Sequence, residues 1–328
     1  MREFIIKLND SGQRLDKFLQ KAIPSLSKGM LYKSIRTKNI KLNGKRTDGA
    51  VMLSEGDVVR CYINDDFFEN KTEASNKLND KKYLFLKAPL ELKIVYEDDN
   101  IIIVNKPVGL VVHDDDHKSE DTLIARVLRY LYESGKYSPE AENSFMPALC
   151  NRLDRNTSGL VIAAKNAAAL REVNRLIRNN SVHKSYLCIT YNIPPKKHDT
   201  LHAYHYRAEG SKSVKISLKK QPHYHEIITR YNVLAENGKL ALLKIDLITG
   251  RTHQIRAHMA FINTPLLGDN KYGNVKINKQ YNIKYQLLCA YNLTFESEKD
   301  SILAYLNGKR FKAELPLFVN KYFPDFKL

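Results

Sequence analysis

The stretch that decides the fold is Asn151-Arg152-Leu153-Asp154-Arg155-Asn156-Thr157-Ser158-Gly159-Leu160-Val161-Ile162-Ala163-Ala164. Its apolar end predicts a buried strand, and Thr157-Ser158-Gly159 predicts a turn that leads into that strand. Asp154 lies between two arginines, and nearby positive charge favours the ionised carboxylate. These features alone suit a catalytic carboxylate and also an ordinary surface aspartate in a loop.

The composition indicates a basic protein that binds a polyanion. The chain has 328 residues, which suits two domains or one large domain with a small module. Lys and Arg number 53 against 36 Asp and Glu, a formal net charge of +17. Such an excess attracts nucleic acid, because each neutralised phosphate releases counterions. A membrane surface is a weaker candidate, because the basic residues are spread along the chain and do not gather on one amphipathic helix.

The cysteines and the hydropathy pattern predict a cytoplasmic location. No C-x-x-C motif occurs, which argues against a zinc ribbon. The four cysteines lie far apart in apolar sequence, as small buried thiols do in a reducing compartment: Cys61, Cys150, Cys188 and Cys289. We expect no signal peptide and no membrane span, because no run approaches the roughly 20 apolar residues that a span needs.

Residues 1–64 form a first unit with a net charge of +7, from 13 Lys and Arg against 6 Asp and Glu. Apolar residues at helical spacing predict a helix from Leu15, and Ser27 can cap a second one. Asn43-Gly44 between strand-like flanks predicts a tight hairpin. If helix and hairpin pack together, their basic residues form one patch that grips RNA phosphates, although a solvated basic face has the same pattern. These residues are Lys33, Arg36, Lys41, Lys45 and Arg46.

Two further segments follow the first unit. Residues 65–88 are polar and lack periodicity, which predicts a linker that lets the first unit move. Residues 89–328 mix strand and helix patterns and carry the chemistry. Within them, residues 166–177 predict a helix with Leu170, Val173 and Ile177 facing inward.

Three long stretches resemble, in the same order, the signatures of the RluA family of RNA pseudouridine synthases. They are YEDDNIIIVNKPVGL at 96–110, RLDRNTSGL at 152–160 and LITGRTHQIRAH at 247–258. The resemblance implies an α+β catalytic domain around a central mixed or antiparallel β-sheet. The first unit, with RLDKFL at 14–19 and KGMLYK at 28–33, resembles the small α/β alpha-L RNA-binding module.

The resemblance also implies roles for single residues. Asp154 matches the catalytic aspartate of the family, and Arg256 matches the arginine that pairs with it. Tyr186 matches the tyrosine that stacks on the target base and is proposed to remove its C5 proton. Arg152 matches the arginine that enters the RNA where the uridine leaves, and we expect Arg155 to contact RNA beside it.

One position departs from the family pattern. The signature usually begins with His, and this chain has Asn151. Because Asn also donates and accepts hydrogen bonds, we expect the loop to hold while its RNA contacts change.

The activity implied is isomerisation of uridine to pseudouridine. The carboxylate attacks C1′ of the ribose or removes the C2′ proton to give a glycal, and the sequence does not choose between these routes. Neither metal, organic cofactor nor nucleotide cofactor is required. We expect a monomer whose partner is RNA, most similar to the RluC-like branch that modifies large-subunit (23S) ribosomal RNA. A tRNA-directed synthase and a catalytically silent ribosome-binding or assembly protein are the alternatives.

Two metal-site hypotheses are weaker. Asp114-Asp115-Asp116 suit a magnesium ion, but three adjacent carboxylates usually face solvent. The histidine pairs at 202 and 205 and at 223 and 225 suit a metallohydrolase, yet no H-E-x-x-H motif occurs.

Overall fold

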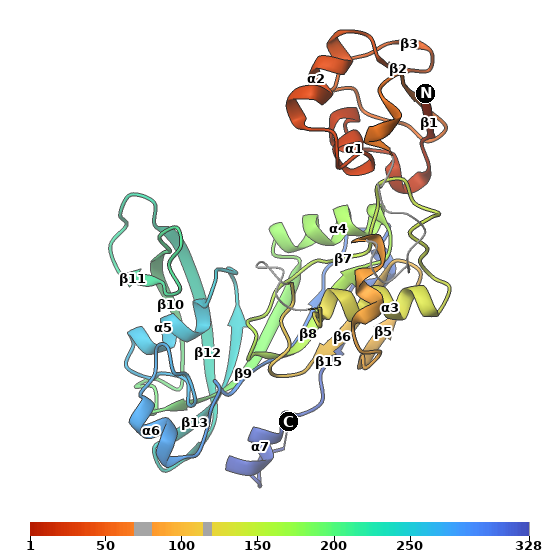
Figure 1. Ribbon diagram of the computed structural model, residues 1–328. Helices are drawn as coiled ribbons and strands as arrows, with labels where there is room; N and C mark the ends of the chain where they lie inside the picture. Colours follow the sequence, from red (N-terminus) through yellow and green to blue (C-terminus); the bar gives the residue numbers. More distant parts are fainter. Residues whose placement is uncertain (69–80, 114–119, 328) are drawn as a thin grey trace.

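The computed structural model describes residues 1–68, 81–113 and 120–327. In this part of the chain, a four-stranded sheet belongs to the N-terminal unit and an eleven-stranded sheet spans the rest. Figure 1 shows the N-terminal unit as a separate lobe beside one end of the large sheet. Helices pack on both faces of the large sheet, so the predicted α+β class is confirmed.

The N-terminal unit is an antiparallel sheet with strand order β1-β4-β2-β3, covered by two helices. Its elements are β1 (Arg2–Ile5), η1 (Leu8–Asp10), α1 (Leu15–Ala22), α2 (Lys28–Arg36), β2 (Ile40–Leu42), β3 (Lys45–Arg46) and β4 (Val58–Cys61). The predicted cap is confirmed, because the Ser27 hydroxyl accepts a hydrogen bond from the Met30 N–H. The predicted hairpin is also confirmed, with Asn43 and Gly44 both at positive φ.

The large sheet has the strand order β11-β10-β12-β13-β9-β14-β8-β6-β5, with β7 and β15 on side branches. Its strands are β5 (Ile94–Glu97), β6 (Ile101–Lys106), β7 (Ala148–Leu149), β8 (Ser158–Ala164), β9 (Val182–Tyr191), β10 (His198–Tyr206), β11 (Lys215–Ser217), β12 (His225–Asn237), β13 (Leu240–Leu247), β14 (Leu288–Phe295) and β15 (Arg310–Lys312). Among the described strands, the β8–β14 pair is parallel and the other pairs are antiparallel.

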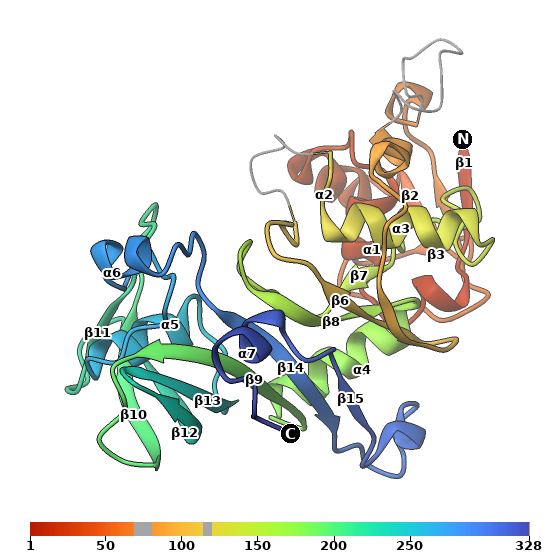
Figure 2. The same ribbon diagram turned by 90° about the horizontal axis from the view of Figure 1, so that it is seen from below.

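Helices bury both faces of this sheet. They are α3 (Leu123–Glu133), α4 (Ala167–Arg178), α5 (Gln254–Phe261), α6 (Val275–Gln280) and α7 (Leu317–Tyr322), with short turns η2 (Asp65–Phe67), η4 (Lys81–Lys87) and η5 (Ala304–Leu306). Because side chains alternate along a strand, Ile102 and Val104 of β6 face α3 and α5, whereas Ile101 and Ile103 face α4. In Figure 2, α7 lies across β9 and β14, where Val319 joins a further apolar cluster.

The structure confirms Val173 as an inward residue of α4, but the other two predicted positions are not the deepest contacts of the helix. Ala169, Val173 and Leu176 are its buried contacts, whereas Leu170 and Ile177 are only partly buried at the edge of the cluster. The small Ala169 lets the helix approach the sheet on that side, and a pattern of large apolar residues does not reveal such a contact.

The start of β8 also differs from the prediction. Ser158 and Gly159 belong to the strand and do not form a turn, because they pair with Cys289 and Ala290 of β14. Gly159 has a φ of +113°, and a Cβ there would lie 2.2 Å from the Ala290 carbonyl oxygen. The parallel partner therefore approaches so closely that only glycine fits.

The N-terminal unit docks on the large unit through η1. The Asp10 carboxylate is fully buried and accepts hydrogen bonds from Asn143 Nδ2 at 2.7 Å and Ser144 Oγ at 2.6 Å. Asn9 Oδ1 accepts one from the N–H of Ala167, the first residue of α4, at 3.1 Å. The first unit, for which the predicted linker would permit movement, therefore contacts the large unit through these hydrogen bonds.

The predicted linker, residues 65–88, is described only in part, because residues 69–80 lie outside the described residues. Its last residues form η4, where Tyr83 and Phe85 are buried against Leu128 of α3. No helix in the described ranges has the length and apolarity to cross a bilayer.

We predict that Gly159→Ala destabilises the protein by about 3 kcal/mol, because the new Cβ meets the β14 backbone and the backbone is held at positive φ. Gly238→Ala is the matched control, because Gly238 also has positive φ but no atom within 4 Å of the added Cβ. That control should lose only about 1 kcal/mol. Urea denaturation measures both, and equal losses would contradict the close approach of β14.

Candidate active site

Asp154 lies in a tight turn between β7 and β8. Its backbone carbonyl accepts the Thr157 N–H at 3.0 Å, and its side chain is 27% exposed. Asn151 fixes the chain just before this turn, because its Oδ1 accepts the Ile162 N–H at 2.8 Å and its Nδ2 donates to the Leu160 carbonyl at 3.3 Å. The asparagine that replaces the usual histidine thus holds the loop against β8, as expected.

Arg256, on the first turn of α5, reaches Asp154 across 102 residues of sequence. Its Nη1 donates to Asp154 Oδ2 at 2.8 Å, and its side chain is only 9% exposed. The structure thus brings together the two residues that the resemblance paired. A second buried carboxylate completes the contact: Asp269 accepts from Arg256 Nε at 2.7 Å and from Nη2 at 2.9 Å.

The Asp269 contact went unnoticed in the sequence. Asp269 follows the apolar Leu266-Leu267 and has a fully buried side chain. The one available signal was indirect, since an arginine on a buried helix face needs a carboxylate partner. The sequence did not indicate that two carboxylates share it.

Arg256 and Asp269 each stabilise the charged form of the other. Burial alone would lower the pKa of Arg256, but the hydrogen bonds and charges of Asp269 and Asp154 raise it above its ordinary value. Burial acts against ionised Asp269, yet the hydrogen bond and charge of Arg256 lower its pKa overall. The arrangement is therefore a carboxylate–guanidinium–carboxylate chain that ends at Asp154.

His253 stands on the open side of Asp154. Its Nε2 lies 3.9 Å from Asp154 Oδ1, and its Nδ1 lies 2.9 Å from the Tyr272 hydroxyl. Burial lowers the pKa of His253 to about 4, so the imidazole is neutral at neutral pH. The Tyr272 ring centroid lies 5.4 Å from the Arg256 guanidinium carbon, within cation–π range.

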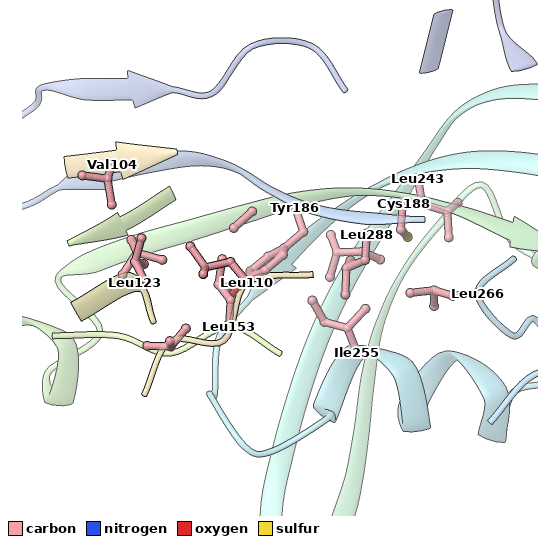
Figure 3. Close-up of a cluster of buried hydrophobic side chains, with 14 of the residues drawn as sticks. Val104, Leu110, Leu123, Leu153, Tyr186, Cys188, Leu243, Ile255, Leu266 and Leu288 are labelled. Carbon is pink, nitrogen blue, oxygen red and sulfur yellow. The ribbon is translucent and has the colours of Figure 1, made fainter. Parts of the chain in front are cut away.

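Tyr186 lies on β9 in the apolar wall of the site. Figure 3 shows its ring beside Leu110 and Leu153. Burial first, and the charge of Asp154 second, raise the pKa of Tyr186, so its hydroxyl stays protonated. The structure therefore places the predicted stacking residue next to the predicted carboxylate.

Lys106, a second residue that sequence reasoning missed, joins the two loops around Asp154. It has no exposed surface, and its Nζ donates to the carbonyls of Pro107, Leu110 and Arg155 at 2.9, 2.7 and 2.9 Å. Burial lowers the pKa of Lys106 to about 8, against the opposing charge of Asp154. The ammonium group thus fixes the backbone on both sides of the site.

The predicted RNA contacts fall into two groups. Arg152 and Arg155 are exposed beside Asp154. The basic residues of the N-terminal unit lie on α2 and on the β2–β3 hairpin, which are in contact. Lys33, Arg36, Lys45 and Arg46 are exposed, and Lys41 is partly buried. This second group lies on the separate lobe of Figure 1, whereas Asp154 belongs to the large unit, between β7 and β8.

A polar hollow of about 540 Å³ opens next to His253. It is lined by His205, Tyr206, Arg207, His223, His225, Arg251 and Thr252. Its position is fixed by His205, whose Nε2 lies 2.9 Å from the Thr252 carbonyl. Basic and aromatic side chains of this kind suit phosphate and base contacts of RNA.

The histidine pairs do not form a metal site within the described part of the chain. Three of the four histidines considered line this hollow, but residues 1–68, 81–113 and 120–327 contain no cluster of three His, Cys, Asp or Glu residues suited to a metal ion. Asp114-Asp115-Asp116 lie outside the described residues.

The sequence is similar to RNA pseudouridine synthases over nearly its whole length. The profile of the RNA pseudouridylate synthase family matches residues 100–261. A Mycoplasma capricolum protein named an uncharacterized RNA pseudouridine synthase is 34% identical, covering 94% of this chain and 96% of that protein. The ribosomal large subunit pseudouridine synthase C of Rickettsia bellii is 31% identical over 97% and 99% of the two chains. The protein of that name from Haemophilus influenzae is 32% identical over 90% and 87%.

Solved structures share the fold. Human RNA pseudouridylate synthase domain containing 4 matches with a TM-score of 0.55 at 23% identity, covering 69% of this chain and 89% of that one. Human RNA pseudouridylate synthase domain containing 1 matches with a TM-score of 0.55 at 21% identity, covering 71% and 87%.

We predict that Lys106→Met destabilises the protein by about 1–3 kcal/mol, because three carbonyls, one of them buried, lose their donor. Lys93→Met is the control, since Lys93 is half exposed and its ion pair among the described residues is with the exposed Glu314. The control should change stability by less than about 0.5 kcal/mol. Urea denaturation compares the two, and equal stability of both variants would show that Lys106 does not brace the loops.

Proposed function

The chain belongs to the RNA pseudouridylate synthase family, and we propose that it isomerises uridines of large-subunit ribosomal RNA with Asp154 as its catalytic carboxylate. Family membership makes it an RNA pseudouridine synthase, an isomerase that acts on RNA. The observation that carries the assignment of the site is the 2.8 Å contact between Arg256 and Asp154. This contact singles out one carboxylate in the signature loop and supports a fixed orientation for it.

The reaction needs a single carboxylate with one oxygen available. The C1′–N1 bond breaks, the uracil turns, C5 bonds to C1′, and the C5 proton leaves while N1 gains one. The base must first leave the RNA stack. Arg256 holds Asp154 Oδ2, and Oδ1 accepts no hydrogen bond from any described residue. Oδ1 is therefore the atom that we assign to the ribose.

Two routes from this geometry remain open. Oδ1 attacks C1′ as a nucleophile, or it removes the C2′ proton to give a glycal. Both routes consume no water and transfer no electrons, so the paired acid of a hydrolase has no task. The proposal accordingly includes no metal and no organic cofactor.

We assign Tyr186 to the target base. Its ring lies in an apolar wall with Leu110 and Leu153, where a flipped uracil can stack on it, an interaction worth about 1–3 kcal/mol. The raised pKa of Tyr186 keeps its hydroxyl protonated, which supports stacking more than removal of the C5 proton.

We propose three basic surfaces for the rest of the RNA. Arg152 and Arg155 flank the site, and a guanidinium plane can fill the gap that the flipped uridine leaves. The hollow beside His253 takes phosphates next to the target, with Arg207 and Arg251 on its wall. The basic patch of the N-terminal unit, residues 1–64, grips more distant phosphates, and its docked position supports a fixed spacing from Asp154.

The relatives support the choice of target. The Rickettsia and Haemophilus proteins are named for the ribosomal large subunit, and their alignments cover 97% and 90% of this chain. We propose domains at 1–64 and 89–328 with a linker at 65–88, acting as a monomer in the cytoplasm. The four cysteines are unpaired, which supports a reducing compartment.

We predict that Asp154→Asn lowers turnover by about 10⁴-fold or more while RNA affinity is retained, because the amide neither attacks C1′ nor removes a proton. Single-turnover conversion of a large-subunit RNA fragment measures this, with filter binding for affinity. Asp99→Asn, an exposed aspartate outside the site, is the control and should act like the wild type. Turnover at the normal rate in Asp154→Asn would refute the assignment.

The target itself is tested in cells. Mapping pseudouridine in total RNA with and without the gene should show sites lost from large-subunit ribosomal RNA, and sites lost only from tRNA would exclude the proposed target.

We also predict that replacing Lys45 and Arg46 with Gln lowers the salt dependence of RNA binding. Each lost phosphate contact reduces the slope of log affinity against log salt by roughly 0.7–0.9. Gln at Lys17 and Lys21 of α1 is the charge-matched control, because α1 lies away from the hairpin in Figure 1. Equal slopes of log affinity against log salt for the two double variants would show that the RNA does not bind at the β2–β3 hairpin.

A further inference from the structure

We propose that Asp269 is a positioning residue for the reaction: it clamps the Arg256 guanidinium and offsets its charge, so that Asp154 is oriented without being neutralised. The inference rests on the proposed roles of Asp154 and Arg256 and adds a third residue to them. Asp269 touches neither the proposed ribose position nor the exposed surface, so it acts through Arg256.

The two aspartates share the N–H groups of the Arg256 guanidinium unequally. Asp269 takes two N–H groups in a bidentate contact at 2.7 and 2.9 Å, and Asp154 takes a single one at 2.8 Å. Side-chain exposure rises along the chain, from 0% at Asp269 through 9% at Arg256 to 27% at Asp154. The bidentate contact fixes the plane of the guanidinium, and this plane sets the direction of the remaining N–H toward Asp154.

The Asp269 carboxylate is itself held by its own turn. Its Oδ1 also accepts the N–H groups of Lys271 at 2.8 Å and Tyr272 at 3.1 Å. Asn278 of α6 braces the same turn, accepting the Gly268 N–H at 2.8 Å and donating to the Asp269 carbonyl at 3.1 Å. A Cβ at Gly268 would lie 2.0 Å from the Tyr285 carbonyl oxygen, so the turn packs closely on the segment around Tyr285 and only glycine fits there.

The charges give the clamp a second effect. Arg256 and Asp269 form a neutral pair, and the three groups together carry one negative charge. Without Asp269, Asp154 would face an uncompensated cation 2.8 Å away in a poorly solvated site. Such a cation stabilises the ionised carboxylate and weakens it as a nucleophile or base. Asp269 thus lets Arg256 orient Asp154 with only a small loss of the nucleophilicity or basicity of the Asp154 carboxylate.

Other charged or titratable groups also surround Asp154, and the test leaves them in place. They are Lys106 at the end of β6, Tyr186 on β9, His253 at the start of α5, Lys271 and Tyr272 in the turn after Asp269, and Arg152 and Arg155 in the loop of Asp154. Only the charge of Asp269 is removed in this test. A shift in the acid limb of the pH–activity profile therefore reports on Asp269.

The test compares Asp269→Asn with Asn278→Ala in the full chain. Asp269→Asn should slow single-turnover isomerisation by about 10²-fold with RNA affinity unchanged, because the guanidinium loses its fixed plane. The acid limb of its pH profile should move to lower pH, because a negative charge near Asp154 has gone. Asn278→Ala loosens the turn but keeps the charge, so it should slow the reaction without moving the acid limb. An unchanged rate in Asp269→Asn, or an acid limb that stays in place, would overturn the proposal.

A double variant covers the case in which Asp269→Asn folds poorly with an unpaired buried arginine. Arg256→Gln with Asp269→Asn replaces the pair by two neutral amides. Because Asp269 acts through Arg256, the double variant should match Arg256→Gln alone within about 3-fold. If the fold-losses in rate of the two single variants multiply in the double variant, the proposal is overturned. A wild-type rate in Arg256→Gln would overturn the role of Arg256 and this inference together, whereas a slow Arg256→Gln beside a wild-type Asp269→Asn would overturn this inference alone.

Discussion

The site depends on one buried guanidinium shared by two carboxylates. Arg256 is almost fully enclosed, and a buried arginine is tolerated only when its donors and its charge find partners. Asp269 accepts two of the guanidinium N–H groups from inside the fold, and Asp154 accepts a third at the surface of the site. The same contact therefore compensates the buried arginine and orients Asp154, the carboxylate that we propose as catalytic.

Around this contact, backbone groups are held more tightly than side chains. Lys106 binds three carbonyls on both sides of the Asp154 loop, and Asn151 ties the start of the loop to β8. Gly159 lets β14 approach β8 with no space for a Cβ. A reaction that must turn a freed base before it bonds again benefits from such rigidity, because the ribose and the carboxylate keep their places meanwhile.

We propose that RNA binding is divided between two parts of the molecule. The large unit holds the proposed active site and a hollow lined by basic and aromatic residues beside it, while the N-terminal unit carries a separate basic patch. The buried Asp10 and its partners Asn143 and Ser144 join the two units. Docking of this kind makes the spacing between patch and site a property of the protein, and we see in it a basis for choosing among exposed uridines.

The sequence by itself determined the family, the α+β class, the hairpin and caps of the first unit, and the signature residues Asp154, Tyr186 and Arg256. Those features are local, because each depends on a short pattern of neighbouring residues. Tertiary structure alone decided the rest: the roles of Asp269 and Lys106, the strand position of Gly159, and the docking of Asp10. The partners of these residues lie far along the chain. Compensation of a buried charge and the close approach of two backbones produce no repeating pattern in the sequence.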